Sequence, residues 1–192
     1  MAFYLRFMII PIFIASTSML AYSAGVTAEE KRSPGNEKKN STGMTNKAMD
    51  EIIRRIAKDI EGGQGFWRFH IQNKEIIVIT DDKADRMRIM TPIVEAEKLD
   101  SARLLRLMQA NFDSALDARY SIAKNVLWGT FLHPLQSLSG REFLSGLGQV
   151  VNLSNTYGST YSSGAIIFRG GDSDSLRERE LIDNLINKGL AI

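Results

Sequence analysis

The sequence contains no cysteine, so disulfide bonds, thiolate metal ligands and thiol catalysis are all excluded. It also has almost no excess of charge, because 24 basic residues stand against 22 acidic ones. A balance this close favours neither nucleic acid nor an acidic membrane surface as a partner. Only two histidines occur, and neither has an acidic neighbour at a metal-binding spacing such as HExxH. The composition therefore predicts no metal site and no cofactor.

The first residues have the pattern of a secretory signal peptide. Arg6 precedes an apolar stretch, residues 7–21, and small residues follow. Cleavage after Ser23 places two small residues at the required positions, so residues 1–23 are predicted to be the signal peptide. The apolar stretch is shorter than the roughly 20 residues of a spanning helix, and Pro11 interrupts it. We therefore expect an exported, periplasmic protein that meets a membrane only if this segment stays uncleaved.

The segment 24–44 is polar, contains Pro34, Gly35 and Gly43, and has no apolar periodicity. It is therefore predicted to be a disordered linker. The hydrophobic share of the chain, 44%, suits one domain with a single core. We divide the remainder into an α+β domain, 45–158, and a C-terminal extension, 159–192, with a helix near 175–188.

Residues 45–133 alternate between helical and strand periodicities. Apolar residues at helical spacing predict a first helix that ends at Gly62 and Gly63. The segments FWRFHIQ, EIIVIT and RMRIMTPIV alternate as three antiparallel strands do. A second helix is predicted over residues 101–112, and ARYSIA and VLWGTFL then supply two more strands. One face of that helix is predicted to carry the apolar residues Leu104, Leu105, Met108 and Phe112.

The clearest local signal is the start of the next helix. Ser139 and Glu142 have the spacing of a capping box, and Leu138 and Phe143 stand where a hydrophobic staple belongs. The predicted order is therefore helix, three strands, helix, two strands and helix. This order predicts an α+β fold in which helices pack on an antiparallel sheet, followed by a C-terminal helical extension.

The chain resembles the type III secretion chaperone-like superfamily, and is most similar to its YbjN-like and CesT-like branches. The resemblance rests on this element order, on the asparagine near the end of LLRLMQANF, on a strand of the ARYSIA kind, and on a strand that runs into HPL before a helix. It implies a small, non-catalytic domain that recognises a protein segment or client through apolar surfaces, as a homodimer. Those chaperones are typically cytoplasmic and acidic, whereas this chain has an export signal and is nearly neutral, so a type III effector is not the implied client.

The alternative function is a small-ligand-binding protein or a hydrolase, which would need ionisable groups clustered in a pocket. Ser162, His133 and Asp117 can be combined into a triad on paper, but no nucleophile elbow supports it. The aromatic residues lie on predicted strands, where they are typical of a core and not of ligand stacking. We therefore predict that the protein is not an enzyme and binds no nucleic acid.

The strand VLWGTFL has apolar residues on both faces, whereas a sheet with one solvated face should alternate. Val126, Trp128 and Leu132 form one stripe, and Leu127 and Phe131 form the other. One stripe needs a cover: the C-terminal extension, a second subunit or a bound client. Parity alone does not decide which stripe faces inward. We predict that Leu127 and Phe131 are the outward, partner-binding pair and that Trp128 lies in the core.

Overall fold

The structure of the protein, a computed structural model, describes residues 43–164 and 173–191. The predicted signal peptide, 1–23, and the predicted linker up to residue 42 lie outside the described residues. No helix in the described ranges is long and apolar enough to cross a membrane. The α-helices of these ranges are α1 (Asn46–Ile56), α2 (Ser101–Asp113), α3 (Gly140–Thr156) and α4 (Ser173–Gly189), and a 3-10 turn, η1 (Ala96–Lys98), precedes α2.

The strands of the described residues form one six-stranded sheet with the order β1-β2-β3-β4-β6-β5. All neighbouring strands are antiparallel. The expected α+β fold, an antiparallel sheet packed by helices, is confirmed, and β1 is a strand that the sequence did not predict. The strands are β1 (Glu61–Gly63), β2 (Phe66–Ile71), β3 (Lys74–Asp81), β4 (Arg86–Glu95), β5 (Arg119–Ala123) and β6 (Val126–His133).

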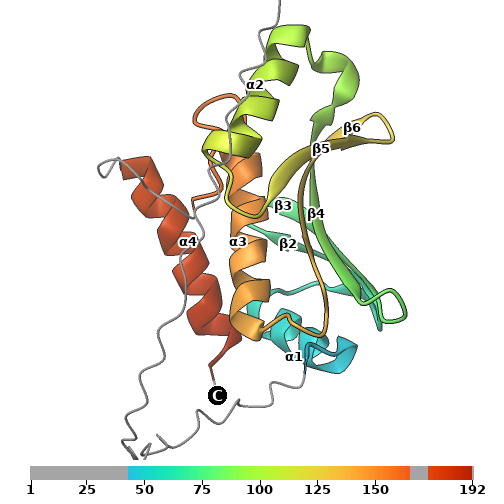
Figure 1. Cartoon of the computed structure of the whole chain (residues 1–192). Helices are drawn as coiled ribbons and strands as arrows, with labels where there is room; N and C mark the ends of the chain where they lie inside the picture. The colour runs from blue at the N-terminus through green and yellow to red at the C-terminus, as the bar shows by residue number, and fades with distance from the viewer. Residues whose placement is uncertain (1–42, 165–172, 192) are drawn as a thin grey trace, which may run out of the picture. The chain divides into compact units, whose positions relative to one another are not determined.

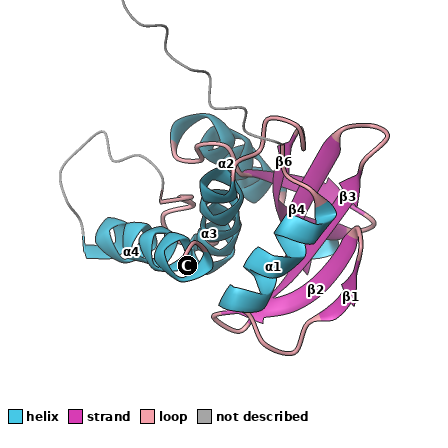
Figure 2. Ribbon diagram, turned by 90° about the horizontal axis from the view of Figure 1, so that it is seen from below, coloured by secondary structure: helices cyan, strands magenta, loops and turns pink. Residues whose placement is uncertain are grey.

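The helices gather on one face of the sheet (Figure 1). α3 lies against β4 and β6, and α4 packs on α3 and α1 on the side away from the sheet (Figure 2). Alternate strand positions point toward α1 and α3 and supply the core between these layers. Its largest fully buried side chains include Trp67, Phe69, Phe143, Ile76 and Ile89. The sheet therefore has one face under the helices and one face that no described helix covers.

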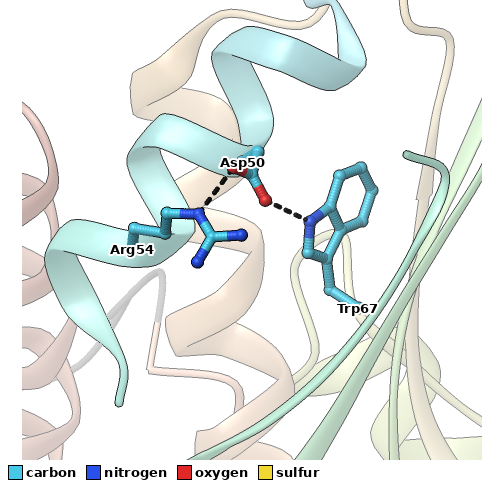
Figure 3. Close-up of polar contacts among 3 residues, drawn as sticks. All are labelled: Asp50, Arg54 and Trp67. Carbon is cyan, nitrogen blue, oxygen red and sulfur yellow. Dashed lines mark hydrogen bonds and ion pairs between the residues drawn. The ribbon is translucent and has the colours of Figure 1, made fainter. Parts of the chain in front are cut away.

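α1 is fixed to the sheet by an apolar stripe and by one carboxylate. Asp50 Oδ1 accepts a hydrogen bond from Trp67 Nε1 of β2 at 2.9 Å, and its Oδ2 accepts one from Arg54 Nε at 2.7 Å (Figure 3). These bonds, from Arg54 first and then Trp67, hold the pKa of the Asp50 carboxyl below its usual range. Trp67 is fully buried, so Asp50 satisfies an indole N–H that the core would otherwise leave unpaired.

α1 ends earlier than the sequence predicts. The helix stops at Ile56, and Asp59 then adopts a left-handed conformation with φ of 52°. Gly62 and Gly63, predicted as the helix stop, instead lie in β1, where Gly62 pairs with Trp67. Gly62 has a positive φ of 84°, and a Cβ there would overlap the Phe66 carbonyl. The glycines therefore serve an edge strand and not a helix end.

α3 begins with the capping box that the sequence predicts. Ser139 Oγ accepts a hydrogen bond from the Glu142 backbone N–H at 3.2 Å, and Glu142 Oε2 accepts one from the Ser139 N–H at 2.8 Å. Further along the helix, Gly146 lies under the ring of Phe131, where a Cβ would approach the ring to 2.7 Å. The missing side chain lets α3 lie close to β6.

The C-terminal helix packs on its own chain. Gly148 of α3 leaves room for Ile182 of α4, because a Cβ at residue 148 would lie 2.6 Å from the Ile182 Cγ1. Asn152 Nδ2 donates to a backbone carbonyl of α4 at 3.0 Å, and Lys188 Nζ donates to the last carbonyl of α1 at 3.0 Å. α4 therefore covers the outer side of the helical layer and not the uncovered face of the sheet. The division into residues 45–158 and 159–192 stays a prediction.

Candidate protein-binding surface

The face of the sheet opposite the helices carries a cluster of apolar side chains, which we call the open face. Three of its members are well exposed: Phe66 at 40%, Ile79 at 39% and Leu132 at 54%. The other three are half-buried. A hollow of about 540 Å³ lies over the cluster. The six residues of the open face, contributed by β2, β3, β4 and β6, are Phe66, Ile77, Ile79, Met90, Trp128 and Leu132.

Strand register makes this apolar surface continuous. Phe66 of β2 is paired with Ile79 of β3, Ile79 with Arg88 of β4, and Arg88 with Leu132 of β6. In the adjacent row Ile77 of β3 is paired with a methionine of β4. Directly paired residues have their Cβ atoms about 5 Å apart. The open face is therefore one patch across four strands, with the Arg88 side chain set among apolar neighbours.

The Trp128 ring is held in place by its own chain, with no binding partner present. Its Nε1 donates to the Ala123 carbonyl of β5 at 2.9 Å. Next to it, the hydroxyls of Ser121 and Thr130 lie 3.1 Å apart and hydrogen-bond with each other. A fixed aromatic side chain loses little conformational freedom when a partner covers it. This end of the open face is therefore already ordered for binding.

The predicted assignment of the two faces of β6 is wrong. Leu127 and Phe131, predicted to point outward, are 1% and 3% exposed and lie under the helices. Trp128, predicted to be core, lies on the open face. Gly129 shares its face with Leu127, and a Cβ there would lie 3.3 Å from a carbonyl of α3. A glycine on one stripe of the strand was the available signal, because a helix that packs closely needs room on that side.

A second apolar cluster lies on α2, and we call it the α2 stripe. The sequence predicts that its four members share one face of that helix, and in the structure this face is exposed. α2 packs on β5 beyond the end of α3 and buries Leu107 and Ala110 instead. Asn111 fixes this position, because its side chain exchanges hydrogen bonds with both the N–H and the carbonyl of Tyr120. The stripe consists of Leu104, Leu105, Met108 and Phe112, which are 36%, 61%, 56% and 90% exposed.

Ionisable side chains gather in a hollow of about 380 Å³ between β6 and α3. Their polar atoms have structural partners: Gln149 Nε2 donates to Asp117 Oδ2 at 3.3 Å, and Arg119 donates to two backbone carbonyls. His133 Nδ1 lies 2.8 Å from the Pro134 carbonyl. Hydrogen bonds from Ser139 lower the pKa of the Glu142 carboxyl. The hollow is therefore a satisfied polar network that fixes the loop before β5.

The triad that can be composed from the sequence is not assembled. Asp117 and His133 both line this hollow, but Ser162 does not. Ser162 lies in the loop after α3, where its Oγ accepts a hydrogen bond from the Gly164 N–H at 3.0 Å. Within the described ranges, no group of three or more His, Cys, Asp or Glu residues could hold a metal ion. The hollow over the open face is lined mainly by apolar side chains, which makes it the candidate protein-binding site.

No protein-family model matches the chain, and no curated protein matches it. Among solved structures, the chain is similar to the HopA1–SchA chaperone–effector complex, at 9% identity and a TM-score of 0.47, over 58% of this chain and 90% of that chain. It is similar to the ExsC–ExsE complex at 11% identity and a TM-score of 0.47, over 58% and 92%. It is also similar to the Yersinia pestis type III secretion chaperone SycH in complex with a stable fragment of YscM2, at 16% identity and a TM-score of 0.45, over 58% and 98%. All three similarities lie below 25% identity and below a TM-score of 0.5.

Proposed function

We propose that the protein is a non-catalytic, chaperone-like module that binds a segment of another protein on the open face. The observation that carries this proposal is the hollow over six apolar side chains on a sheet face that no described helix covers. Contiguous exposed apolar surface on a soluble protein marks an interaction site. The bound segment would remove Phe66, Ile79 and Leu132 from water, which is the driving force for its capture.

The shape of the hollow favours a polypeptide over a small molecule. Sites for small ligands enclose most of the ligand and present a few convergent polar groups. Here the hydroxyls nearest the floor, those of Ser121 and Thr130, are already bonded to each other, and the Trp128 N–H is bonded to a backbone carbonyl. The hollow therefore offers a broad apolar contact in which these two hydroxyls and the indole N–H are not free to orient a small ligand.

The proposal also includes a homodimer and export. The α2 stripe supports the homodimer, because it exposes four apolar residues of one helix, with Phe112 at 90%. Two copies related by a twofold axis could place stripe against stripe, as isologous interfaces do. Export to the periplasm is supported by the signal-like pattern of residues 1–23.

The test uses two matched pairs of aspartate substitutions and an array of synthetic peptides that vary in apolar content and charge. The peptides have about 14 residues, a length at which a helix can cross the sheet. Ile79→Asp with Leu132→Asp changes the open face, and Leu105→Asp with Phe112→Asp changes the α2 stripe. All four positions are more than a third exposed, so both pairs should fold, as circular dichroism and thermal melting will check. The open-face pair should lose peptide binding, while its molar mass, measured by light scattering, should stay equal to that of the wild type.

The α2 pair should keep peptide binding and halve the mass measured by light scattering. Peptide binding that survives in the open-face pair would overturn the proposed site. A wild-type protein that is monomeric at every concentration would overturn the homodimer and leave the proposed site standing.

A further inference from the structure

The two charged side chains that line the hollow over the open face are both basic. Eleven residues line the hollow, and they include Arg88 and Lys124 but no aspartate or glutamate. None of the ion pairs between described residues involves Arg88 or Lys124. Arg68, by contrast, lies 3.4 Å from Glu61 and 3.9 Å from Glu75. The hollow therefore presents two cations that an acidic partner could neutralise.

The position of Arg88 makes its charge important for selection. It is the third residue of β4 and is paired with Ile79 on one side and Leu132 on the other. A partner that covers these apolar neighbours also removes water from the guanidinium, and a charge that loses its hydration without gaining a counter-charge is costly. The hollow should therefore discriminate against a neutral or basic occupant.

The sheet also restricts the backbone of the occupant. β3, β4 and β6 are paired with strands on both sides, so the open face offers side chains and no backbone groups. An extended segment lying across it would leave its own N–H and carbonyl groups without partners where the contact is dry. An α-helix satisfies those groups internally. The open face is therefore suited to an amphipathic helix that lies on it.

The dimensions give the length of that helix. The lining of the hollow runs from β2 through β3, β4 and β6 to Ser121 and Ala123 of β5, and neighbouring strands are about 4.8 Å apart, so the hollow is about 19 Å wide. A helix that rises 1.5 Å per residue covers this width with about 13 residues.

We propose that the partner segment is an acidic amphipathic helix of about 13 residues, an inference that rests on the proposed function of the open face. Its apolar stripe packs on Phe66, Ile79 and Leu132, and carboxylates beside the stripe pair with Arg88 and Lys124. The apolar floor provides the attraction, and the two cations select the sign of the charge on the partner.

The experiment uses three synthetic peptides of about 14 residues with one identical leucine and isoleucine stripe. The flanking positions hold glutamate in the first peptide, glutamine in the second and lysine in the third. Dissociation constants are measured by fluorescence anisotropy for the wild type, for Arg88→Glu with Lys124→Glu, and for Ile79→Asp with Leu132→Asp. The glutamate peptide should bind the wild type about tenfold more tightly than the glutamine peptide. The lysine peptide should bind most weakly, and the charge-reversed variant should prefer it.

Added salt should reduce these preferences, since the charge pairs are only partly shielded from solvent. If all three peptides bind the wild type with equal affinity, and all three fail to bind Ile79→Asp with Leu132→Asp, the acidic partner is overturned and the proposed function of the open face stands. If no peptide binds, and the aspartate pair alone converts a dimer into a monomer, the occupant is a second copy and both proposals fail.

Discussion

Replacement of Asp50 tests how α1 is held on the sheet. Asp50→Ala removes the acceptor of the Trp67 indole N–H, at 2.9 Å, and Trp67 is fully buried. Leaving a buried donor without its partner costs about 1–3 kcal/mol. The Asp50 side chain is 28% exposed, so water can reach part of the site, and we expect a loss of about 1–2 kcal/mol of unfolding free energy. The exposed pair with Arg54 should contribute little, so Arg54→Ala is the matched control.

The assay is urea unfolding of Asp50→Ala, Trp67→Phe and the double variant. Phenylalanine keeps most of the ring and lacks the N–H, so the cost of Asp50→Ala should fall sharply in that background, with a coupling of about 1 kcal/mol. Asp50→Asn keeps an acceptor oxygen and should lose less stability than the alanine variant. The role of Asp50 is refuted if Asp50→Ala lowers the free energy of unfolding equally in the wild type and in Trp67→Phe. It is also refuted if Asp50→Ala lowers this free energy no more than Arg54→Ala does.

The same site has a defined pH dependence. The folded-state pKa of Asp50 lies below its ordinary value of 3.8, so its charge stabilises the fold fully above that value. This contribution is lost as the pH falls through the lower, folded-state pKa. The stability difference between wild type and Asp50→Ala should therefore be constant near neutral pH and shrink below about pH 4. A difference that grows on acidification would contradict this assignment.

Two further variants test the faces of β6 and the docking of α4. Phe131→Ala should cost about 3–5 kcal/mol, whereas Leu132→Ala, at a side chain that is 54% exposed, should cost less than about 1 kcal/mol; equal urea midpoints would show that the faces are misassigned. Gly148→Ala should loosen α4, because its Cβ would lie 2.6 Å from Ile182, and this steric cost should exceed the gain of about 1 kcal/mol in helix propensity. Faster proteolysis within α4 would support this prediction, and unchanged or slower cleavage would contradict it.

Most regular elements could be predicted because their signals are local. The capping box of Ser139 and Glu142 marks the start of α3, and the alternation of FWRFHIQ and EIIVIT marks β2 and β3. β1 has three residues, two of them glycine, and therefore has no alternation to detect. It forms because β2 offers an unpaired edge, which is a property of the assembled sheet.

The faces could not be predicted because they depend on tertiary packing. The stripes of β6 are both apolar, and only the close approach of α3 to this strand, at Gly129 of β6 and Gly146 of α3, decides that Leu127 and Phe131 are inward. The stripe of α2 shows the same limit. An apolar stripe predicts that a helix needs a cover, but it does not say whether the cover comes from the same chain.

The central claim, that the open face receives a protein helix, is tested most directly by methyl NMR during titration with the glutamate-flanked peptide. The methyl signals of Ile77, Ile79, Met90 and Leu132 should shift together, while those of the buried Leu127 and of Ile182 in α4 should stay in place. Shifts confined to the α2 stripe or to α4, with the open-face methyl groups unchanged, would contradict it.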